Sequence, residues 1–233
     1  MIKMRKAPEP HKFAVCSPAD MPIKKFYEGV FEEVFIFFHP FFKPETIDYD
    51  LFNPDTYPAK SEIRDDCEMV SWKQFMEISN ITSYEHVDIG LRTMILGLNK
   101  TYANEEIAKV IHDTCDQHKI IYPTEGYFPE LIMDKLLQGI KNIGYDWIWR
   151  GDEFCTKRKL EYIDDLIEDA NLLEIEDKNL FTHDNSILLT THWDSHFSLL
   201  CSNKKTVNIL VDTCDLEGFY CSETTEIYWS VRN

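Results

Sequence analysis

The sequence is poor in glycine, which accounts for only 8 of its 233 residues. Phosphate-binding loops and dinucleotide fingerprints need closely spaced glycines, because their backbone amides must approach the phosphates without side chains in the way. The chain has no such loop, and it has no Gly-x-Ser-x-Gly nucleophile elbow either. These absences argue against nucleotide hydrolysis, hydride transfer and the common serine hydrolases.

Positive charge is also scarce. The chain has 24 Lys and Arg against 41 Asp and Glu, which gives a formal net charge of −17. A field of this sign repels phosphate backbones and anionic lipid headgroups, so we expect no nucleic-acid partner and no membrane partner. It would attract a basic protein or a cation, although solubility alone is the commoner reason for an acidic surface.

Cysteine pairs and long apolar runs are missing as well. Seven cysteines is an odd number, and none of them forms a Cys-x-x-Cys pair, which predicts free thiols in a reducing compartment. The N-terminal cations are not followed by an apolar run, as they would be in a signal peptide. The longest apolar stretch, Val34–Phe42, is interrupted by His39 and Pro40 and is too short to span a bilayer. We therefore expect a cytoplasmic protein, of undetermined oligomeric state.

The composition predicts a folded chain with one main domain. Hydrophobic residues make up 44% and aromatic residues 13%, which is enough for a substantial core. Residues 1–21 contain three prolines and no clear periodicity, and we expect an extended arm there. Residues 22–233 are expected to form a single α+β domain, helical over 22–170 and mainly β over 180–231.

Several helices are predicted from apolar spacing and from capping residues. After Pro22, apolar residues recur every three or four positions as far as Phe38, which predicts a helix that ends before Pro40. The sequence leaves open whether Phe31–Phe42 is buried or docks a partner. The other expected helices begin at Ser71 (with Gln74 as a capping box), Ser83, Asn104, Pro129 (ending at Gly144) and Thr156, and a short strand is expected at 146–150.

From residue 180 onward the apolar period changes to two. Strands are expected at 187–193, 196–201, 206–212 and 225–231, as an antiparallel meander. Because the helices come first and the strands last, the predicted class is α+β, with N-terminal and central helices packed on a C-terminal meander.

The candidate site lies in this meander. His192, Asp194 and His196 are spaced by two, so on one straight strand they would share a face and could bind a divalent metal. That strand would run for fifteen residues, against a usual length of about five or six. A turn at Asp194-Ser195 is therefore favoured, with His192 opposite Phe197 and the two imidazoles on opposite faces.

A second candidate is the pair His196 and Asp212. A three-residue loop after the strand 196–201 would place these two side chains opposite each other. A neighbouring carboxylate fixes the tautomer of an imidazole and raises its pKa, which suits proton transfer. A polar pair on a half-exposed sheet face is the commoner meaning of such a contact.

The run Ile-Leu-Leu-Thr-Thr-His-Trp-Asp-Ser-His-Phe-Ser-Leu-Leu-Cys at 187–201 resembles the C-terminal hairpin of uncharacterised bacterial proteins in domain-of-unknown-function families. The resemblance implies no activity and no catalytic residue. By analogy it is compatible with acidic immunity proteins that neutralise toxins. Two hypotheses follow: a protein-binding module, or a metal-dependent or His/Asp general-base hydrolase with its site on the C-terminal sheet.

Overall fold

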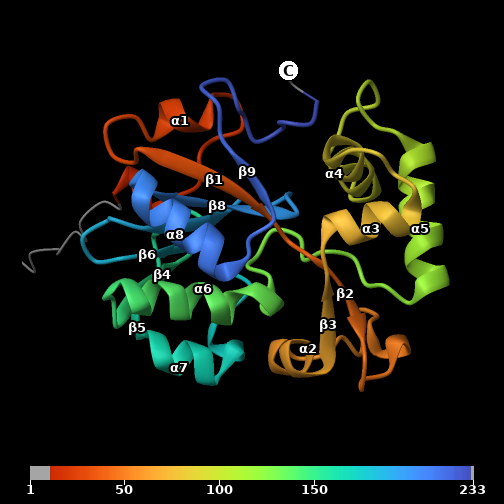
Figure 1. The fold of residues 1–233 in the computed structure, drawn as a ribbon, viewed down its shortest axis with the longest axis horizontal. Coiled ribbons are helices and arrows are strands. Elements are labelled where there is room, and N and C mark those ends of the chain that lie inside the picture. Colours follow the sequence, from red (N-terminus) through yellow and green to blue (C-terminus); the bar gives the residue numbers. More distant parts are fainter. Residues whose placement is uncertain (1–10, 232–233) are drawn as a thin grey trace, which may run out of the picture.

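The computed structural model describes residues 11–231, and a seven-stranded antiparallel sheet lies at its centre (Figure 1). The strand order is β5-β4-β6-β7-β8-β1-β9, so the meander β6-β7-β8 is extended on one side by a strand from the N-terminal part of the chain. A separate two-stranded sheet pairs β2 with β3. The strands are β1 (Glu33–Phe38), β2 (Phe41–Pro44), β3 (Cys67–Val70), β4 (Trp147–Gly151), β5 (Arg158–Tyr162), β6 (Asn179–Phe181), β7 (Leu188–Thr191), β8 (Phe197–Ser202) and β9 (Gly218–Tyr220).

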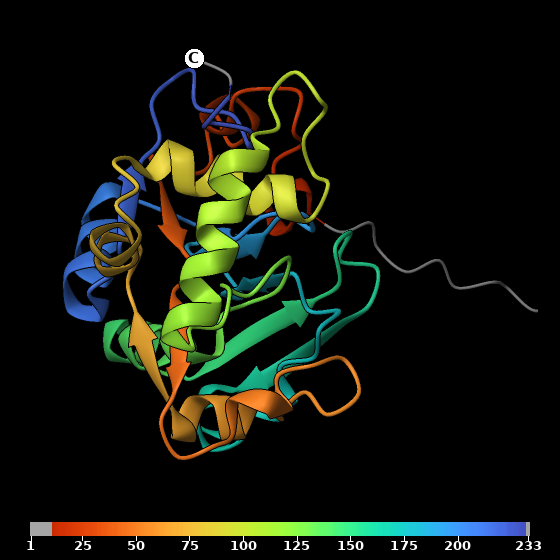
Figure 2. The ribbon, with the colours of Figure 1, turned by 90° about the vertical axis from the view of Figure 1, so that its right-hand side faces the viewer.

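Helices cover the sheet and extend beyond it, so the predicted α+β class is confirmed. Figure 1 shows α3, α4 and α5 at the right of the molecule, apart from α6 and α8, and in Figure 2, which faces that side, they lie in front of the sheet. None of the helices within residues 11–231 is long and apolar enough to cross a membrane. They are α1 (Ile23–Phe26), α2 (Lys60–Asp66), α3 (Trp72–Ser79), α4 (Tyr84–Met94), α5 (Glu105–His118), α6 (Glu130–Ile143), α7 (Ile163–Glu168) and α8 (Lys204–Cys214).

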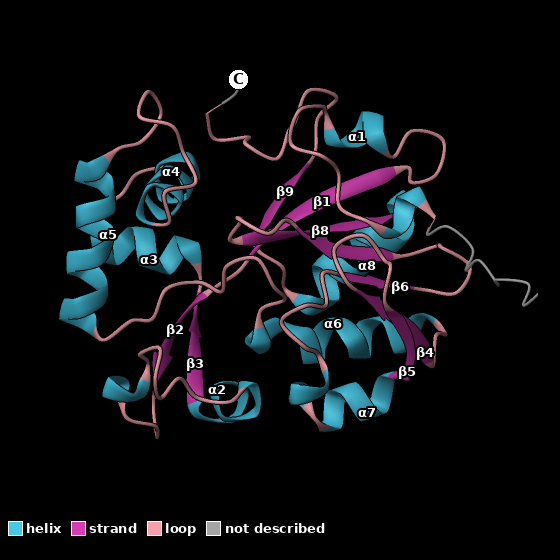
Figure 3. Cartoon of the chain, turned by 180° about the vertical axis from the view of Figure 1, so that it is seen from behind, coloured by secondary structure: helices cyan, strands magenta, loops and turns pink. Residues whose placement is uncertain are grey.

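Strand β1 is buried on both of its faces. Its residues Phe35 and Phe37 belong to the core formed with α6, α7 and α8, which lie along one side of the sheet (Figure 3). Its residues Val34, Ile36 and Phe38 belong to the opposite core, formed with α1, α3, α4 and α5. A strand that is covered on both sides has no reason to alternate apolar with polar residues.

The helix predicted over residues 22–38 is therefore wrong. Only Ile23–Phe26 is helical, and the Phe-rich segment that follows is strand β1, which lies between β8 and β9 in the sheet. A short, continuously apolar run fits a buried strand as well as a buried helix, and periodicity cannot separate the two. The structure also answers the open question about Phe31–Phe42, because all of its phenylalanines are buried.

Three further segments differ from the prediction. The helix expected from Thr156 begins as strand β5 and becomes helical only at Ile163. The strand expected at 206–212 is part of helix α8. The strand expected at 225–231 is not formed: residues 227–231 make turns, and Trp229 packs on Phe38 of β1 and Phe219 of β9.

The predicted capping signals were more reliable. Ser71 and Gln74 form a capping box at α3, and the side chains of Ser83 and Asn104 cap α4 and α5. Helix α6 follows Pro129 and ends at Gly144, whose φ of 118° needs a residue without a Cβ. The strand expected at 146–150 is β4.

Part of the predicted arm, residues 1–10, lies outside the described residues. Its remainder packs on the body: Phe13 and Ala14 are buried, and the Val15 carbonyl accepts a hydrogen bond from the Tyr27 hydroxyl at 2.8 Å. All seven cysteines are free thiols, as predicted.

Candidate functional site: the turn at Trp193 and its buried support

The chain reverses direction at residues 192–195, as the favoured hairpin requires. Strands β7 and β8 pair with Thr191 opposite Ser198, which is the strand alignment that the favoured hairpin requires. The Ser195 amide closes the turn by donating to the His192 carbonyl at 3.2 Å. The predicted register of the two strands is therefore confirmed. The turn itself centres on Trp193 and Asp194, one residue before the predicted Asp194-Ser195, so His192 faces Ser195 rather than Phe197.

His192 and Asp194 lie together inside this turn. Nδ1 of His192 hydrogen-bonds Oδ1 of Asp194, and the Tyr228 hydroxyl donates to Asp194 Oδ2 at 2.7 Å. Burial alone would raise the pKa of Asp194, but the hydrogen bonds from His192 and Tyr228 and the nearby positive charge of Arg92 lower it below its ordinary value. Asp194 is therefore a buried carboxylate held in its charged form.

His196 is buried close by but makes no comparable contact. Its Nδ1 has no hydrogen-bond partner among the described residues. Burial, followed by the neighbouring charge of Arg92, lowers its pKa to about 3, so the ring is neutral at physiological pH. Within residues 11–231, no group of three or more His, Cys, Asp or Glu side chains is arranged to hold a metal ion.

Asp212 lies away from these residues. The prediction paired it with His196 across two strands, but it is an exposed residue on helix α8, so that pairing is not formed. Asn203 starts this helix by accepting a hydrogen bond from the Thr206 amide at 2.9 Å. Val207, Leu210 and Cys214 then bury one helical face against α6.

Arg92, which the sequence analysis missed, occupies the space beneath the turn. Its guanidinium is fully buried, and its Nε donates to Asp88 Oδ2 at 2.9 Å, one helical turn earlier on α4. Its Nη1 donates to the Asp194 carbonyl at 3.1 Å, and its Nη2 donates to Ser195 Oγ and to the Ile227 carbonyl, both at 3.0 Å. One buried cation thus joins α4, the turn and the C-terminal segment.

Aromatic rings and a hydroxyl complete this support. The guanidinium carbon of Arg92 lies 4.7 Å from the ring centre of Tyr228 and 5.5 Å from that of Phe197. Ser230 Oγ donates to Asp88 Oδ2 at 2.5 Å. Stacking and fork-shaped hydrogen bonding are properties of arginine that lysine does not share. The sequence signal for this group was the spacing of Asp88 and Arg92, four residues apart on a helix.

Gly126 supports the turn from its other side. Its amide donates to the Ser195 carbonyl at 2.9 Å, and its φ of 68° lies in the left-handed region. A Cβ at this position would be 2.1 Å from the Trp193 carbonyl oxygen. Only glycine lets the two backbones approach so closely, and the Gly126 carbonyl in turn accepts a hydrogen bond from Lys178 Nζ.

The turn exposes a single large side chain. Trp193 is 59% exposed, whereas Asp194, Ser195 and His196 are each no more than 3% exposed. The buried residues that surround it therefore hold the backbone of the turn while its indole faces solvent.

Three comparisons with known proteins concern the whole chain. Residues 19–231 match the model of a family described as "Protein of unknown function (DUF2711)". The chain belongs to this DUF2711 family. It is also similar to the Bacillus subtilis (strain 168) protein described as "Uncharacterized protein YwbB", with 24% identity over 186 residues that cover 74% of this chain and 77% of the relative. No solved structure matches the chain.

These matches confirm the resemblance to uncharacterised bacterial proteins, and the DUF2711 match extends it from the hairpin to almost the whole chain. The matched range includes Arg92, Gly126 and the Trp193 turn. Neither description states an activity.

One further histidine has the hydrogen bonds of a general base. Nδ1 of His39 lies 2.6 Å from the Thr124 carbonyl, which can only accept, so this nitrogen carries the proton. Its Nε2 then accepts from the Ser198 hydroxyl at 2.7 Å. The Ser198 and His39 side chains are both fully buried, and burial lowers the His39 pKa to about 4. The pair therefore joins β8 to the 122–128 loop without offering a nucleophile to solvent.

Proposed function

We propose that this protein acts by binding another protein, and that Trp193 is the anchor of the binding surface. The observation that carries the proposal is the contrast within one turn: an indole that is 59% exposed stands on a backbone whose neighbouring residues are buried. Tryptophan is prominent among residues that dominate binding energy at protein interfaces.

The support beneath the turn favours binding because it reduces the entropy lost on association. A side chain on a mobile loop must be ordered when a complex forms, and a preorganised one avoids much of that cost. Here the turn is held by Arg92 on one side and Gly126 on the other. Trp193 is thereby presented in a fixed place before any partner arrives.

Charge favours a basic partner. The chain carries a net charge of −17, and Glu125 is an exposed residue directly before Gly126 in the support of the turn. A Lys or Arg of the partner would gain from both the negative field and the indole face. An immunity-type protein that neutralises a basic toxin is one instance of this proposed role.

The side chains that would favour the hydrolase alternative are poorly accessible to a substrate. His39, Asp194, His196 and Ser198 are buried. Burial is the largest influence on every cysteine and raises the pKa of all seven thiols, which disfavours the nucleophilic thiolate. The free thiols also support a cytoplasmic location, which we include in the proposal.

The test compares two exposed tryptophans. Tagged wild-type protein, Trp193→Ala and the control Trp147→Ala, which alters a residue on β4 that is 50% exposed, are used to capture proteins from a bacterial lysate. We expect a basic protein to be retained by wild type and by Trp147→Ala, released as salt is raised, and lost from Trp193→Ala. A circular dichroism spectrum of each variant shows that it is folded. Equal retention by all three proteins, or the absence of any salt-sensitive partner, would contradict the proposal.

A further inference from the structure

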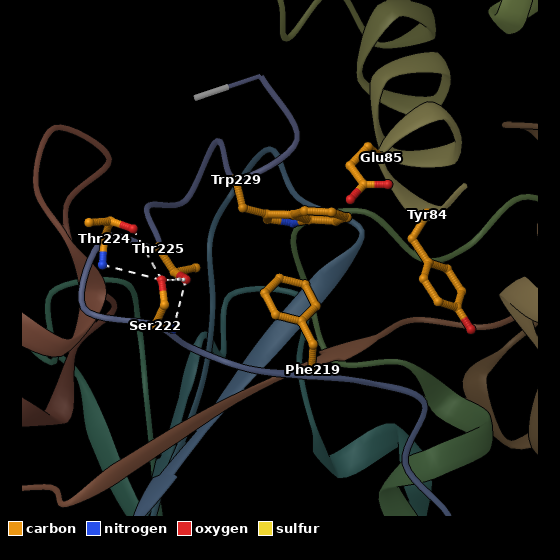
Figure 4. Close-up of a pocket in the computed structure, with 7 residues that line it drawn as sticks. All are labelled: Tyr84, Glu85, Phe219, Ser222, Thr224, Thr225 and Trp229. Atoms are coloured by element: carbon orange, nitrogen blue, oxygen red, sulfur yellow. Dashed lines mark hydrogen bonds between the residues drawn. The ribbon is translucent and has the colours of Figure 1, made fainter. Parts of the chain in front are cut away.

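A pocket separate from the Trp193 turn lies between the start of α4 and the C-terminal segment. Its volume is about 320 Å³, at the small end of the range for ligand sites. Figure 4 shows Trp229 and Phe219 in the middle of the view, with Tyr84 and Glu85 of α4 on one side and Ser222, Thr224 and Thr225 on the other.

The aromatic wall of this pocket is held in place from behind. The rings of Phe219 and Trp229 meet edge to face, with their centres 4.8 Å apart. Trp229 also stacks at 5.8 Å on Phe38, which itself stacks on the buried Trp72 at 4.2 Å. The rings that border the pocket are therefore fixed by core packing and need no rearrangement to receive a ligand.

The charge of the pocket is negative. Glu85 is exposed, and none of the described lining residues is Lys, Arg or His. Lys24 lies beside the same C-terminal loop, but its ammonium is paired with Glu223 at 2.8 Å and with Glu33 at 3.9 Å. Glu85 also suits the first turn of α4, where a carboxylate stabilises the helix dipole, so a test must separate these two roles.

The hydroxyl side of the pocket contributes acceptors. Ser222 Oγ lies 2.9 Å from Thr225 Oγ1 and 3.2 Å from Thr224 Oγ1, and the Ser222 amide donates to Thr225 Oγ1 at 2.9 Å. Ser222 Oγ also accepts from the Thr224 amide at 3.3 Å, so its lone pairs are used within the loop, whereas Thr224 Oγ1 keeps a lone pair that can accept from a ligand.

We propose that this pocket binds an organic ammonium ion. The apolar part of the ligand packs against Phe219 and Trp229, and its ammonium group lies beside Glu85. Aromatic faces and a carboxylate both attract a cation, whereas an anionic ligand would meet Glu85 and the negative field of the whole chain. A free amine and a lysine side chain of a peptide share this chemistry.

The experiment titrates the full-length protein with benzylamine, with benzyl alcohol as its uncharged counterpart, and with N-acetyl-lysine amide as the peptide-like source. Chemical shifts of the tryptophan indole protons report binding. We expect benzylamine to bind saturably, at least about fivefold more tightly than benzyl alcohol, as befits one partly exposed ion pair with a cation–aromatic contact. Tighter binding of the lysine derivative than of benzylamine would assign the site to a peptide, and weaker binding would assign it to free amines.

Two variants with the same helix position separate the roles of Glu85. Glu85 and Glu106 are both exposed and both second in their helices, α4 and α5, so Glu85→Gln and Glu106→Gln lose the same dipole interaction. We expect Glu85→Gln to weaken benzylamine binding about fivefold and Glu106→Gln to leave it unchanged. Phe219→Leu, which keeps an apolar wall without the ring, should weaken benzylamine more than benzyl alcohol.

The proposal is overturned if no probe binds saturably, if the alcohol binds as tightly as the amine, or if Glu85→Gln and Glu106→Gln behave alike. These outcomes do not depend on Trp193, so the proposed ammonium pocket and the proposed protein-binding surface are tested independently.

Discussion

Replacement of Arg92 by methionine tests the support of the turn most directly. Arg92→Met keeps an unbranched side chain of similar length but removes the cation between two carboxylates. Asp88 and Asp194 would stay buried, and the Ser195 hydroxyl and the Ile227 carbonyl would each lose a donor. The variant therefore leaves uncompensated charge in the interior.

The expected loss in the free energy of unfolding follows from that geometry. Removal of one partner from a buried ion pair costs about 3–5 kcal/mol, because the charge left behind can regain neither its partner nor water. Each buried group that loses its hydrogen bond adds about 1–3 kcal/mol unless the site relaxes. We expect a loss of at least about 4 kcal/mol, a large part of the roughly 5–15 kcal/mol that stabilises a typical domain.

Urea unfolding followed by circular dichroism measures this loss. The matched control is Arg64→Met, since Arg64 also contacts two carboxylates, Asp65 and Asp134, but on a partly exposed surface. We expect the control to lose about 1 kcal/mol or less of its free energy of unfolding. An Arg92→Met protein that does not fold agrees with the reasoning. A loss below about 1 kcal/mol, equal to that of Arg64→Met, would refute it.

Three further predictions concern single residues. Burial lowers the pKa of His196 to about 3, whereas the same imidazole in the unfolded chain binds a proton near pH 6.5. Between pH 7 and pH 5 the free energy of unfolding, measured with urea, should therefore fall by about 2 kcal/mol more for wild type than for His196→Gln. Equal pH dependence of the two proteins would contradict this. Gly126→Ala should lower the free energy of unfolding by about 2–4 kcal/mol in thermal unfolding, because the added Cβ would clash with the Trp193 carbonyl oxygen. The control Gly29→Ala, with a φ of 79° and no atom within 4 Å of the added Cβ, should lose only about 1 kcal/mol, and equal losses would argue against the contact. Asp212→Asn should change the free energy of unfolding by less than about 0.5 kcal/mol, since Asp212 is exposed on α8; a larger change would show that Asp212 makes a stabilising contact.

Features that depend on a few neighbouring residues were predictable from the sequence. The caps at Ser71, Ser83 and Asn104 follow from hydrogen bonds that close within three residues. The chain reversal follows from the turn-forming residues Asp194 and Ser195 between two short apolar runs, although the turn forms one residue earlier, at Trp193 and Asp194. The strand register was predictable too, because a turn of known length aligns the strands that it joins.

Features that depend on what covers a segment were not predictable. The β-branched residues of 206–212 suggested a strand, yet this segment is a helix because Val207 and Leu210 pack on α6. Gly139 of α6 permits that approach, since a Cβ there would lie 2.8 Å from Leu210 Cδ2. Tertiary packing overrides a weak local propensity in this way.

The sequence by itself determined the α+β class, most helix starts and the reversal at Trp193, because these follow from composition and from contacts between near neighbours. Only the tertiary structure decided what the reversal is for. The fold brings Arg92 beneath a turn about 100 residues further along the chain. The Ile227 carbonyl, which accepts from Arg92, and the Tyr228 hydroxyl, which donates to Asp194, complete the buried group. A buried ion group of this kind is stabilised by exclusion of water, and that exclusion exists only once both faces of the sheet are covered.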